Sequence, residues 1–545
     1  MMRSPAAAFA WEFRHRHRWY LVALAAYLLA LGLMKPLFLA PDRVVRFDPP
    51  DGFAAFGVVP FSVTFFYLIA VFTFGLTGDV AARQSIYPPR LFTLPVSSAA
   101  LAGWPMLYGT VAMALLWLIA VTLARWPWGV ELPLLWPGLM TAVVLAWLQA
   151  FAWMPYGLRG IRVAIAVIVL TSLNALVMTA LELKLSQPAL VAFLAPQLPI
   201  AYLWACAAVA RARRGHVPDW SFAFARRGTH DDARQRPPFQ STAAAQFWLE
   251  WRRHGRSLSV LVGIVVPFEL SVLFISGYGS KQFVFEVLIA VLTTPILMAA
   301  FASATVSKAN PFAREVYGVS PFAATRPLPT AAMIAAKLKM ATLSTIVAWL
   351  VLLTAMAIGF AWSGADSVLI GWADYWVNRI GIFRTTVAAL IVLGGLISLT
   401  WTMLVQGLFI GLTGRQWLVR AIGTATLVFL MAIGPAYEWI ADSAPARSWL
   451  WNWWQLFPLV LAALKIGAAI WVATRLVRSR LVSDRVLVIG AASWMLAVVL
   501  LHAVLVWWVD MPYVPPHLLL LIAILAVPLV RVSAAPLALD WNRHR

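Results

Sequence analysis

Apolar runs recur along the whole chain, and many reach the roughly 20 residues that an α-helix needs to cross a bilayer. Short polar or charged segments separate them. We therefore expect an all-α polytopic membrane protein with about fourteen transmembrane helices. The predicted ranges are 19–38, 58–77, 101–123, 134–154, 162–181, 189–209, 258–276, 284–306, 340–361, 385–412, 418–440, 455–473, 486–507 and 517–532.

Two similar amphipathic segments precede the first and the seventh predicted spans. Each combines aromatic side chains with Arg and His, a pattern typical of a helix that lies in the lipid headgroup layer. We predict such helices at about 4–18 and 243–257. Their basic residues either face lipid headgroups and fix the topology, or contact a partner protein. The residues that define the two helices are Trp11, Glu12, Arg14, Arg16, Trp248, Glu250, Arg252 and Arg253.

The similarity between the halves continues after the second span of each. Leu94–Ser97 reads Leu-Pro-Val-Ser, and Leu328–Thr330 reads Leu-Pro-Thr. A proline followed by Ser or Thr and an apolar run indicates the start of a helix. We therefore predict that a helix starts after each phrase.

Two later pairs of residues keep a common register between the halves. Arg159 and Arg415 are as far apart in the sequence as Glu182 and Glu438. Six spans per half is an even number, so the halves are parallel repeats with a transport path predicted at their interface. The predicted parts are a first six-span half at 1–210, a basic linker at 211–242, a second half at 243–475, and a two-span hairpin with the tail at 476–545.

Composition agrees with a membrane protein. Of the 545 residues, 62% are hydrophobic and 12% are charged, whereas a soluble domain carries about 25% charged residues. The net charge of +21 is explained by topology, because most Lys and Arg residues fall on one side if both termini are cytoplasmic. We therefore expect contact with membrane lipids and no nucleic-acid partner. His502 and His517 flank the last predicted outside loop and are too few and too far apart for a metal site, so we predict no metal site, and we also predict no catalytic residue.

Ionisable residues inside predicted spans are functional candidates, because a charge is costly in lipid. Glu269 lies in the seventh span and Lys465 in the twelfth. They either belong to a substrate path or gate, or form structural contacts that include a pair with each other.

Two further pairs occupy matched positions in the halves. Glu182 and Glu438 end the fifth span of each half and are either parts of a gate or solvated acids. Gln149 and Gln406 either line a central path or form hydrogen bonds between helices.

The amphipathic helices, the six-span halves and the Leu-Pro-Ser/Thr phrases together resemble the permease subunits of type 2 ABC exporters. In that family the first helix is called the elbow helix, and the segment between the second and third spans couples to an ATPase. The resemblance covers about residues 1–475, which would be a fused pair of halves. It departs from the pattern at Gly103, where the second copy has Lys337. The implied coupling residues are Arg83, Arg90, Pro95, Ser97, Arg314, Glu315, Arg326, Pro329 and Lys337.

The resemblance implies a division of labour between subunits. The sequence has no Gly-x-x-x-x-Gly-Lys-Ser/Thr loop for nucleotide phosphates. ATP and Mg²⁺ are therefore expected in a separate ATP-binding cassette subunit, present in two copies, and not in this chain, which is not itself an enzyme. The resemblance also implies export by alternating access across a bacterial inner membrane.

Two other functions stay open. Gly75–Arg83 loosely resembles the loop after the second span of major-facilitator secondary transporters, although Val80 stands where that loop has its arginine. The other hypothesis is a polytopic glycosyl- or acyltransferase. Asp48 and Asp51 lie in the first outside loop, where membrane glycosyltransferases that use lipid-linked sugars have acidic residues.

Overall fold

The computed structural model is all-helical. Among the described residues every regular element is a helix and no β-strand occurs, which confirms the predicted class. The structure describes residues 4–38, 59–74, 83–125, 131–158, 160–216, 239, 241–274, 281–306, 329–413, 415, 417–418, 421, 425, 443–454, 456–508, 515–527 and 534–543.

Contacts within the chain group it into two compact units. Unit 1 comprises Met1–Gln235 and Trp417–Arg447, and unit 2 comprises Arg236–Gln416 and Ser448–Arg545. One helix, α18 (Ala444–Trp453), runs across a boundary between them.

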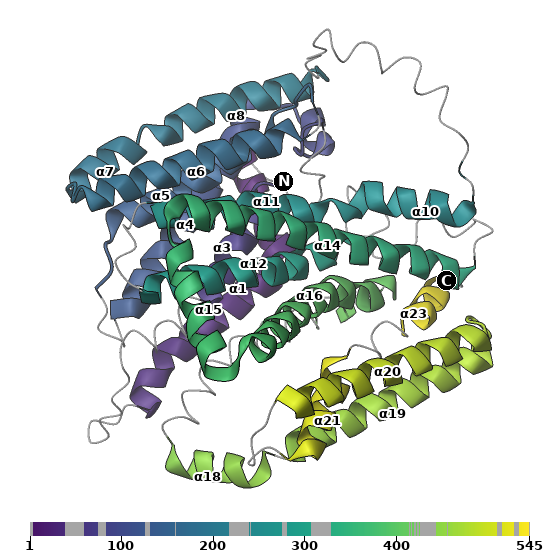
Figure 1. Cartoon of the computed structure of the whole chain (residues 1–545). Helices are drawn as coiled ribbons and strands as arrows, with labels where there is room; N and C mark the ends of the chain where they lie inside the picture. The colour runs from purple at the N-terminus through teal and green to yellow at the C-terminus, as the bar shows by residue number, and fades with distance from the viewer. Residues whose placement is uncertain are drawn as a thin grey trace. The chain divides into compact units, whose positions relative to one another are not determined.

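Unit 1 is a bundle around α5, which packs against α3, α4, α6, α7 and α8 (Figure 1). Its core is apolar, and Leu145 and Trp153 of α5 are fully buried in it. The described elements are α1 (Pro5–Phe38), α3 (Val59–Phe72), η3 (Pro89–Thr93), α4 (Ser98–Arg125), α5 (Leu135–Trp153), α6 (Ile161–Glu182), α7 (Gln187–Leu194) and α8 (Gln197–Arg213).

Unit 2 is built on α11, α12, α14 and α16, which pack against one another, with α23 on α14 and α16. Helices α19 and α20 both contact the short α21. The elements are α10 (Thr242–Glu250), η4 (Trp251–Gly255), α11 (Ser257–Leu270), η5 (Ser271–Phe274), α12 (Lys281–Val306), α14 (Thr330–Ser363), α15 (Asp366–Ile380), α16 (Ile382–Leu412), α19 (Leu456–Ser479), α20 (Asp484–Trp508), α21 (Pro516–Ala526) and α23 (Ala535–Arg543).

A glycine sets the closest approach of two helices in unit 2. A Cβ atom at Gly407 of α16 would lie 2.4 Å from the carbonyl oxygen of Ser303 in α12. Small residues at helix contacts allow backbones to approach in this way, as in other membrane bundles. Any side chain at position 407 would force α12 and α16 apart.

Both predicted helix starts are confirmed. Helix α4 begins at Ser98, and the Ser97 hydroxyl accepts a hydrogen bond from the amide of Ala100 at 3.2 Å. Helix α14 begins at Thr330, directly after Pro329. A side-chain oxygen that binds a free amide of the first turn stabilises a helix start.

Within the part of the chain that the structure describes, ten helices are long and apolar enough to cross a membrane, judged by length and composition. They are Ser98–Thr122, Leu135–Trp153, Ile161–Glu182, Gln187–Arg213, Thr242–Phe274, Lys281–Ser303, Thr330–Ser363, Ile382–Leu408, Leu456–Ser479 and Asp484–Trp508. Each coincides with one of the fourteen predicted spans. The other four fall in α1, in the shorter helices α3 and α21, and in 418–440, most of which lies outside the described residues.

The amphipathic segments are not separate helices. Helix α1 runs without a break from Pro5 to Phe38, so the predicted boundary near residue 18 does not appear. In unit 2, α10 continues through the wider turn of η4 into α11. No proline lies near either predicted boundary, because residues 6–35 and 242–266 contain none, and a helix without a breaking residue propagates at little cost.

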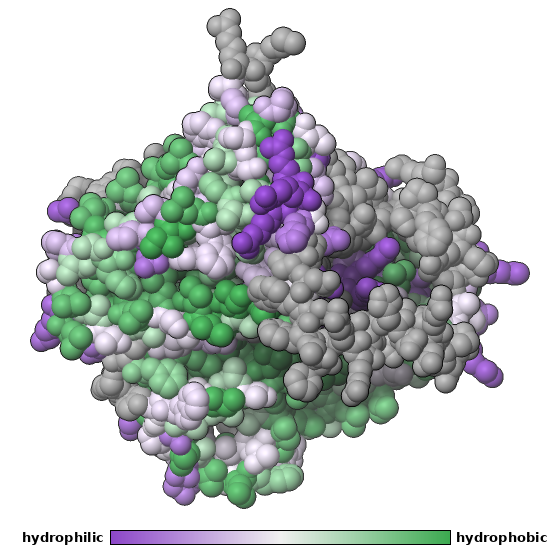
Figure 2. Space-filling view, turned by 90° about the horizontal axis from the view of Figure 1, so that it is seen from above, coloured by the Kyte–Doolittle hydropathy of each residue, from purple (hydrophilic) through white to green (hydrophobic). Residues whose placement is uncertain are grey.

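Much of the described surface is apolar, as Figure 2 shows for one face. Leu203, Leu464 and Val488 each expose about two thirds of their surface (67%, 65% and 67%). They belong to a long series of large apolar side chains that are exposed along most of the described helices. They fit helices that contact lipid, in agreement with a multi-pass membrane protein.

Candidate functional site

The segment at 83–97 of unit 1, which we call the connector, joins α3 to α4 and is fixed to the backbone of its neighbours. The amide of Ile86 donates to the carbonyl of Ala152 at 3.1 Å, and the amide of Tyr156 donates to the carbonyl of Arg83 at 2.9 Å. The Ser85 hydroxyl donates to the carbonyl of Trp153 at 2.6 Å. These bonds hold the connector against the end of α5.

Two arginines hold the connector from other helices. Arg162, in the first turn of α6, is 2% exposed and donates to the carbonyls of Gln84 at 2.6 Å and Met154 at 3.0 Å. Arg213, in the last turn of α8, donates to the carbonyls of Val96 at 2.7 Å and Leu94 at 3.1 Å. Sequence reasoning missed both roles, because an arginine at a span end is ordinarily a topology charge. The only available signal was the position of Arg162 just inside an apolar run.

A buried tyrosine ties the connector to α4. Pro105 lies inside α4 and has no amide hydrogen, so the carbonyl of Leu101 lacks its usual helical donor. The Tyr87 hydroxyl donates to that carbonyl at 2.8 Å, and both residues are fully buried. The rings of Phe74, Phe92 and Trp153 surround Tyr87.

Burial also affects the acid–base behaviour of two tyrosines near the connector. Burial raises the pKa of Tyr87 above its usual range, and the Glu12 carboxylate acts in the same direction. Burial raises the pKa of Tyr156 to about 12, against the opposing effect of Arg162. Both hydroxyls therefore remain protonated at physiological pH.

In each unit, an acidic residue of the amphipathic segment forms an ion pair with a basic residue. That basic residue follows the second predicted span of the same half. In unit 1, Glu12 of α1 pairs with Arg90 of the connector. In unit 2, Glu250 of α10 pairs with Lys337 of α14, with 2.8 Å between Oε2 and Nζ. The Gln246 amide donates to the second carboxylate oxygen of Glu250 at 3.0 Å.

The remaining residues of the amphipathic segments lie mostly at the surface. Trp11 stacks on His15, and Trp248 lies under the guanidinium of Arg252. Arg14 and Arg253 are exposed. The side chain of Arg16 is outside the described part.

Of the predicted coupling residues, Arg83 and Pro95 are exposed on the connector, and Ser97 caps α4. Arg90 and Lys337 are instead occupied in the two ion pairs. Arg314, Glu315 and Arg326 lie outside the described residues. The side-chain contacts within a coupling segment can therefore be given for the first segment only.

Glu269 and Lys465 do not pair with each other, and this alternative was wrong. Glu269 of α11 accepts from the Thr294 hydroxyl of α12, at 2.7 and 2.9 Å from its two carboxylate oxygens. Lys465 of α19 donates to three carbonyls at the end of α21, those of Ile524, Leu525 and Val527, at 2.7, 3.0 and 2.6 Å. The carbonyls at a helix end lack intrahelical donors, and the ammonium group of Lys465 donates hydrogen bonds to them instead.

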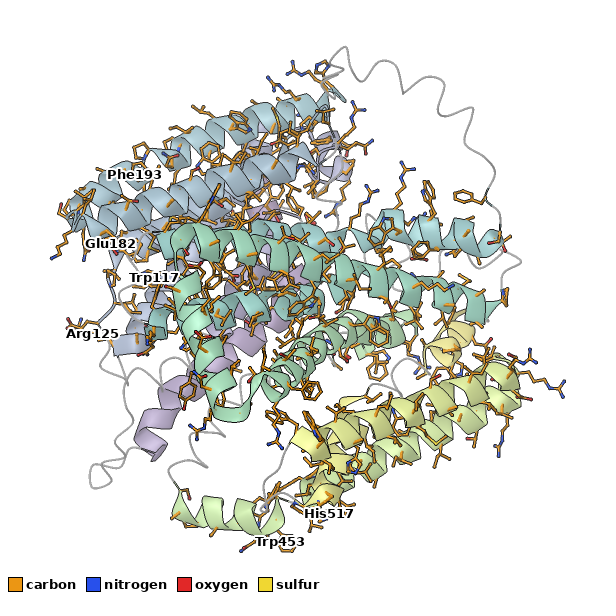
Figure 3. The ribbon with its side chains drawn as sticks, viewed as in Figure 1. Trp117, Arg125, Glu182, Phe193, Trp453 and His517 are labelled. Carbon is orange, nitrogen blue, oxygen red and sulfur yellow. The ribbon has the colours of Figure 1, made fainter. Side chains whose placement is uncertain are left out.

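The matched Gln and Glu pairs are only partly described. Gln149 is fully buried and donates to the carbonyls of Phe72 and Pro105 at 3.1 and 3.2 Å, so it joins three helices. Gln406 donates to the sulfur of Met403 at 3.3 Å. Figure 3 shows Glu182 at the end of α6, where it is exposed. Glu438 is outside the described residues.

Within the described residues no three His, Cys, Asp or Glu side chains are grouped as metal ligands. Compared with known proteins, the chain matches no family model, no curated protein and no solved structure.

Proposed function

We propose that this chain is the transmembrane permease subunit of an ATP-driven exporter, which couples to a separate ATPase subunit through the connector. The single observation that carries the proposal is how the connector is held. Backbone or side-chain bonds attach it to α1, α4, α5, α6 and α8. A segment attached to so many helices passes a displacement on to all of them.

The connector also presents a surface for a partner. Leu94 is 39% exposed, and Pro95 beside it is exposed too. Exposed arginines lie at 83 and at the end of α8, at 211, 213 and 214. An apolar tip with basic residues around it suits a partner that offers an apolar recess with an acidic rim.

Mechanistically, closure of two ATPase subunits around ATP would push the connector, and α4 would follow through Tyr87 and Ser97. Such a step requires that ATP binds one conformation of the complex more tightly than the other. In this proposal the basic segments and both termini face the cytoplasm of a bacterium, as the positive-inside rule favours.

The test is purification of the tagged chain from its host in a mild detergent, followed by mass spectrometry and an ATPase assay. We expect a stoichiometric ATP-binding subunit, reduced by Leu94→Asp. Leu185→Asp is the matched control, because Leu185 is 48% exposed in the turn between α6 and α7, away from the connector. A chain that purifies alone and takes up substrate with a proton gradient and no ATP would instead identify a secondary transporter.

A further inference from the structure

A group of oxygen atoms lies at the contact between α11 and α12 in unit 2. Both carboxylate oxygens of Glu269 lie within hydrogen-bond distance of the Thr294 hydroxyl, at 2.7 and 2.9 Å. The carbonyl oxygen of Ala290 lies 3.1 Å from the same hydroxyl. Thr294 is buried, whereas Glu269 retains some exposed surface.

This group has too few hydrogen-bond donors. A threonine hydroxyl carries one proton, and it faces three acceptor oxygens. Pro295, directly after Thr294, adds to the shortage on α12, because it has no amide hydrogen for the carbonyl of Val291 one turn before it. An acceptor-rich group within apolar helices is costly unless the carboxylate takes up a proton, or a further donor or a cation joins the group.

The described helices around the group supply no such cation. Glu269 is the only charged residue of α11, and its described partner is Thr294. The charged residues of α12 are Lys281 and Glu286, eight or more residues before Thr294, which corresponds to more than about 10 Å along a helix.

The basic residues of η4, Arg252 and Arg253, lie before the start of α11 and so more than ten residues before Glu269. The other neighbours of α11 and α12 carry their charges at the helix ends. In α14 these are Lys337, which pairs with Glu250, and the exposed Lys339, both within the first ten residues of the helix. In α16 the only charged residue is Arg384, near its start.

We propose that Glu269 and Thr294 form a binding site for the ammonium group of an amine-bearing amphiphile, and calling that amine a transported substrate rests on the proposed export function. An ammonium group brings a positive charge and three N–H donors, which is what the oxygen group lacks. The apolar helices around it suit an alkyl chain. Ca²⁺ and Mg²⁺ fit less well, because they take about six oxygen ligands, and among the described residues four oxygens meet at this contact.

The experiment measures binding of a dansylated long-chain primary amine to the purified chain in nanodiscs, by fluorescence. The neutral N-acetyl derivative of the same probe is the ligand control. We expect Glu269→Gln and Thr294→Val each to weaken binding of the amine about tenfold or more, as for loss of a charge-assisted hydrogen bond. Thr294→Ser keeps the hydroxyl and should bind like the wild type.

Glu286→Gln is the matched control variant, because it removes the same charge from an exposed position on α12. The proposed site would be overturned if the wild type and Glu269→Gln bound the amine equally well and thermal unfolding curves showed that both proteins are folded. Equal binding of the amine probe and its acetylated derivative would also overturn it. Displacement of the amine by Na⁺ but not by choline would do the same, because it would indicate a metal-ion site. The assay needs no ATPase, so its result stays separate from a failure to copurify one.

Discussion

Glu250 and Lys337 form an ion pair that is almost removed from water, with side chains that are 8% and 12% exposed. The corresponding acid of unit 1, Glu12, pairs with Arg90, and those two side chains are 25% and 36% exposed. The cations come from different places, one from within α14 and the other from the connector. Where α14 has Lys337, the matched position in α4 is Gly103, against which the ring of Tyr202 packs.

Because the two ion pairs differ in burial, removal of the cation should lower the free energy of unfolding by different amounts. Lys337→Met leaves a buried carboxylate without its charge partner, and we expect the free energy of unfolding to fall by about 3–5 kcal/mol. Arg90→Met affects a pair that water partly screens, and we expect a loss of about 1 kcal/mol or less. Thermal unfolding in detergent, followed by intrinsic tryptophan fluorescence, measures both.

Lys339→Met is the control, because this lysine is exposed on the same helix. The double variant Glu250→Gln with Lys337→Met should recover part of the loss, since no charge is then left buried alone. Equal shifts for Lys337→Met and Arg90→Met would contradict the argument from burial.

A second prediction concerns Tyr87 and Pro105. Tyr87→Phe leaves the buried carbonyl of Leu101 without a donor, and we expect a loss of about 1–3 kcal/mol in unfolding free energy. Pro105→Ala restores an amide at the position that donates to this carbonyl in a regular helix. The cost of Tyr87→Phe should therefore be smaller in the Pro105→Ala background, as a double-mutant cycle of thermal unfolding would reveal. Additive effects of the two changes would exclude this link.

The sequence predicted the elements far better than the contacts between them. The starts of α4 and α14 follow from short local signals, and each of the ten apolar helices coincides with a predicted span. The boundary predicted near residue 18 is absent from α1, because a change from an amphipathic to an apolar pattern does not by itself end a helix.

The contacts of the candidate site depend on residues far apart in the chain. Glu12 and Arg90 are 78 residues apart, as are Arg162 and Gln84, and Lys337 and Glu250 are 87 apart. A single sequence contains no signal that selects one partner among many residues of opposite charge. The charge pattern indicated which residues needed partners, and only the packed structure assigned them.

The buried tyrosines predict a loss of stability at alkaline pH. The pKa of Tyr156 is about 12 in the folded chain, and that of Tyr87 is also raised, against an ordinary value of about 10. Between these values the folded chain binds more protons than the unfolded chain, so unfolding free energy falls as pH rises. The contribution is fully present below about pH 10 and is lost as pH increases to about 12 and beyond.

The measurement is the apparent Tm from about pH 9 to about pH 12, for the wild type and for Tyr156→Phe. The variant has no titrating hydroxyl at 156, so its Tm should depend less steeply on pH. Tyr375→Phe is the control, because Tyr375 is 51% exposed. A pH dependence that Tyr156→Phe leaves unchanged would show that other groups cause it.

The last prediction concerns the end of α21. Lys465 supplies donors to the carbonyls of Ile524, Leu525 and Val527, and the indole of Trp494 donates to Val527 as well, at 3.3 Å. Inside a membrane, free backbone carbonyls find no water to replace a lost donor. Lys465→Met should therefore loosen α21 locally, because each unsatisfied group costs about 1–3 kcal/mol.

Hydrogen exchange by mass spectrometry should show faster exchange over 516–527, with little change in α11 or α14. Lys281→Met, which removes an exposed lysine at the start of α12, should leave exchange in α21 unchanged. If Lys465→Met also leaves it unchanged, the ammonium group does not stabilise the end of this helix.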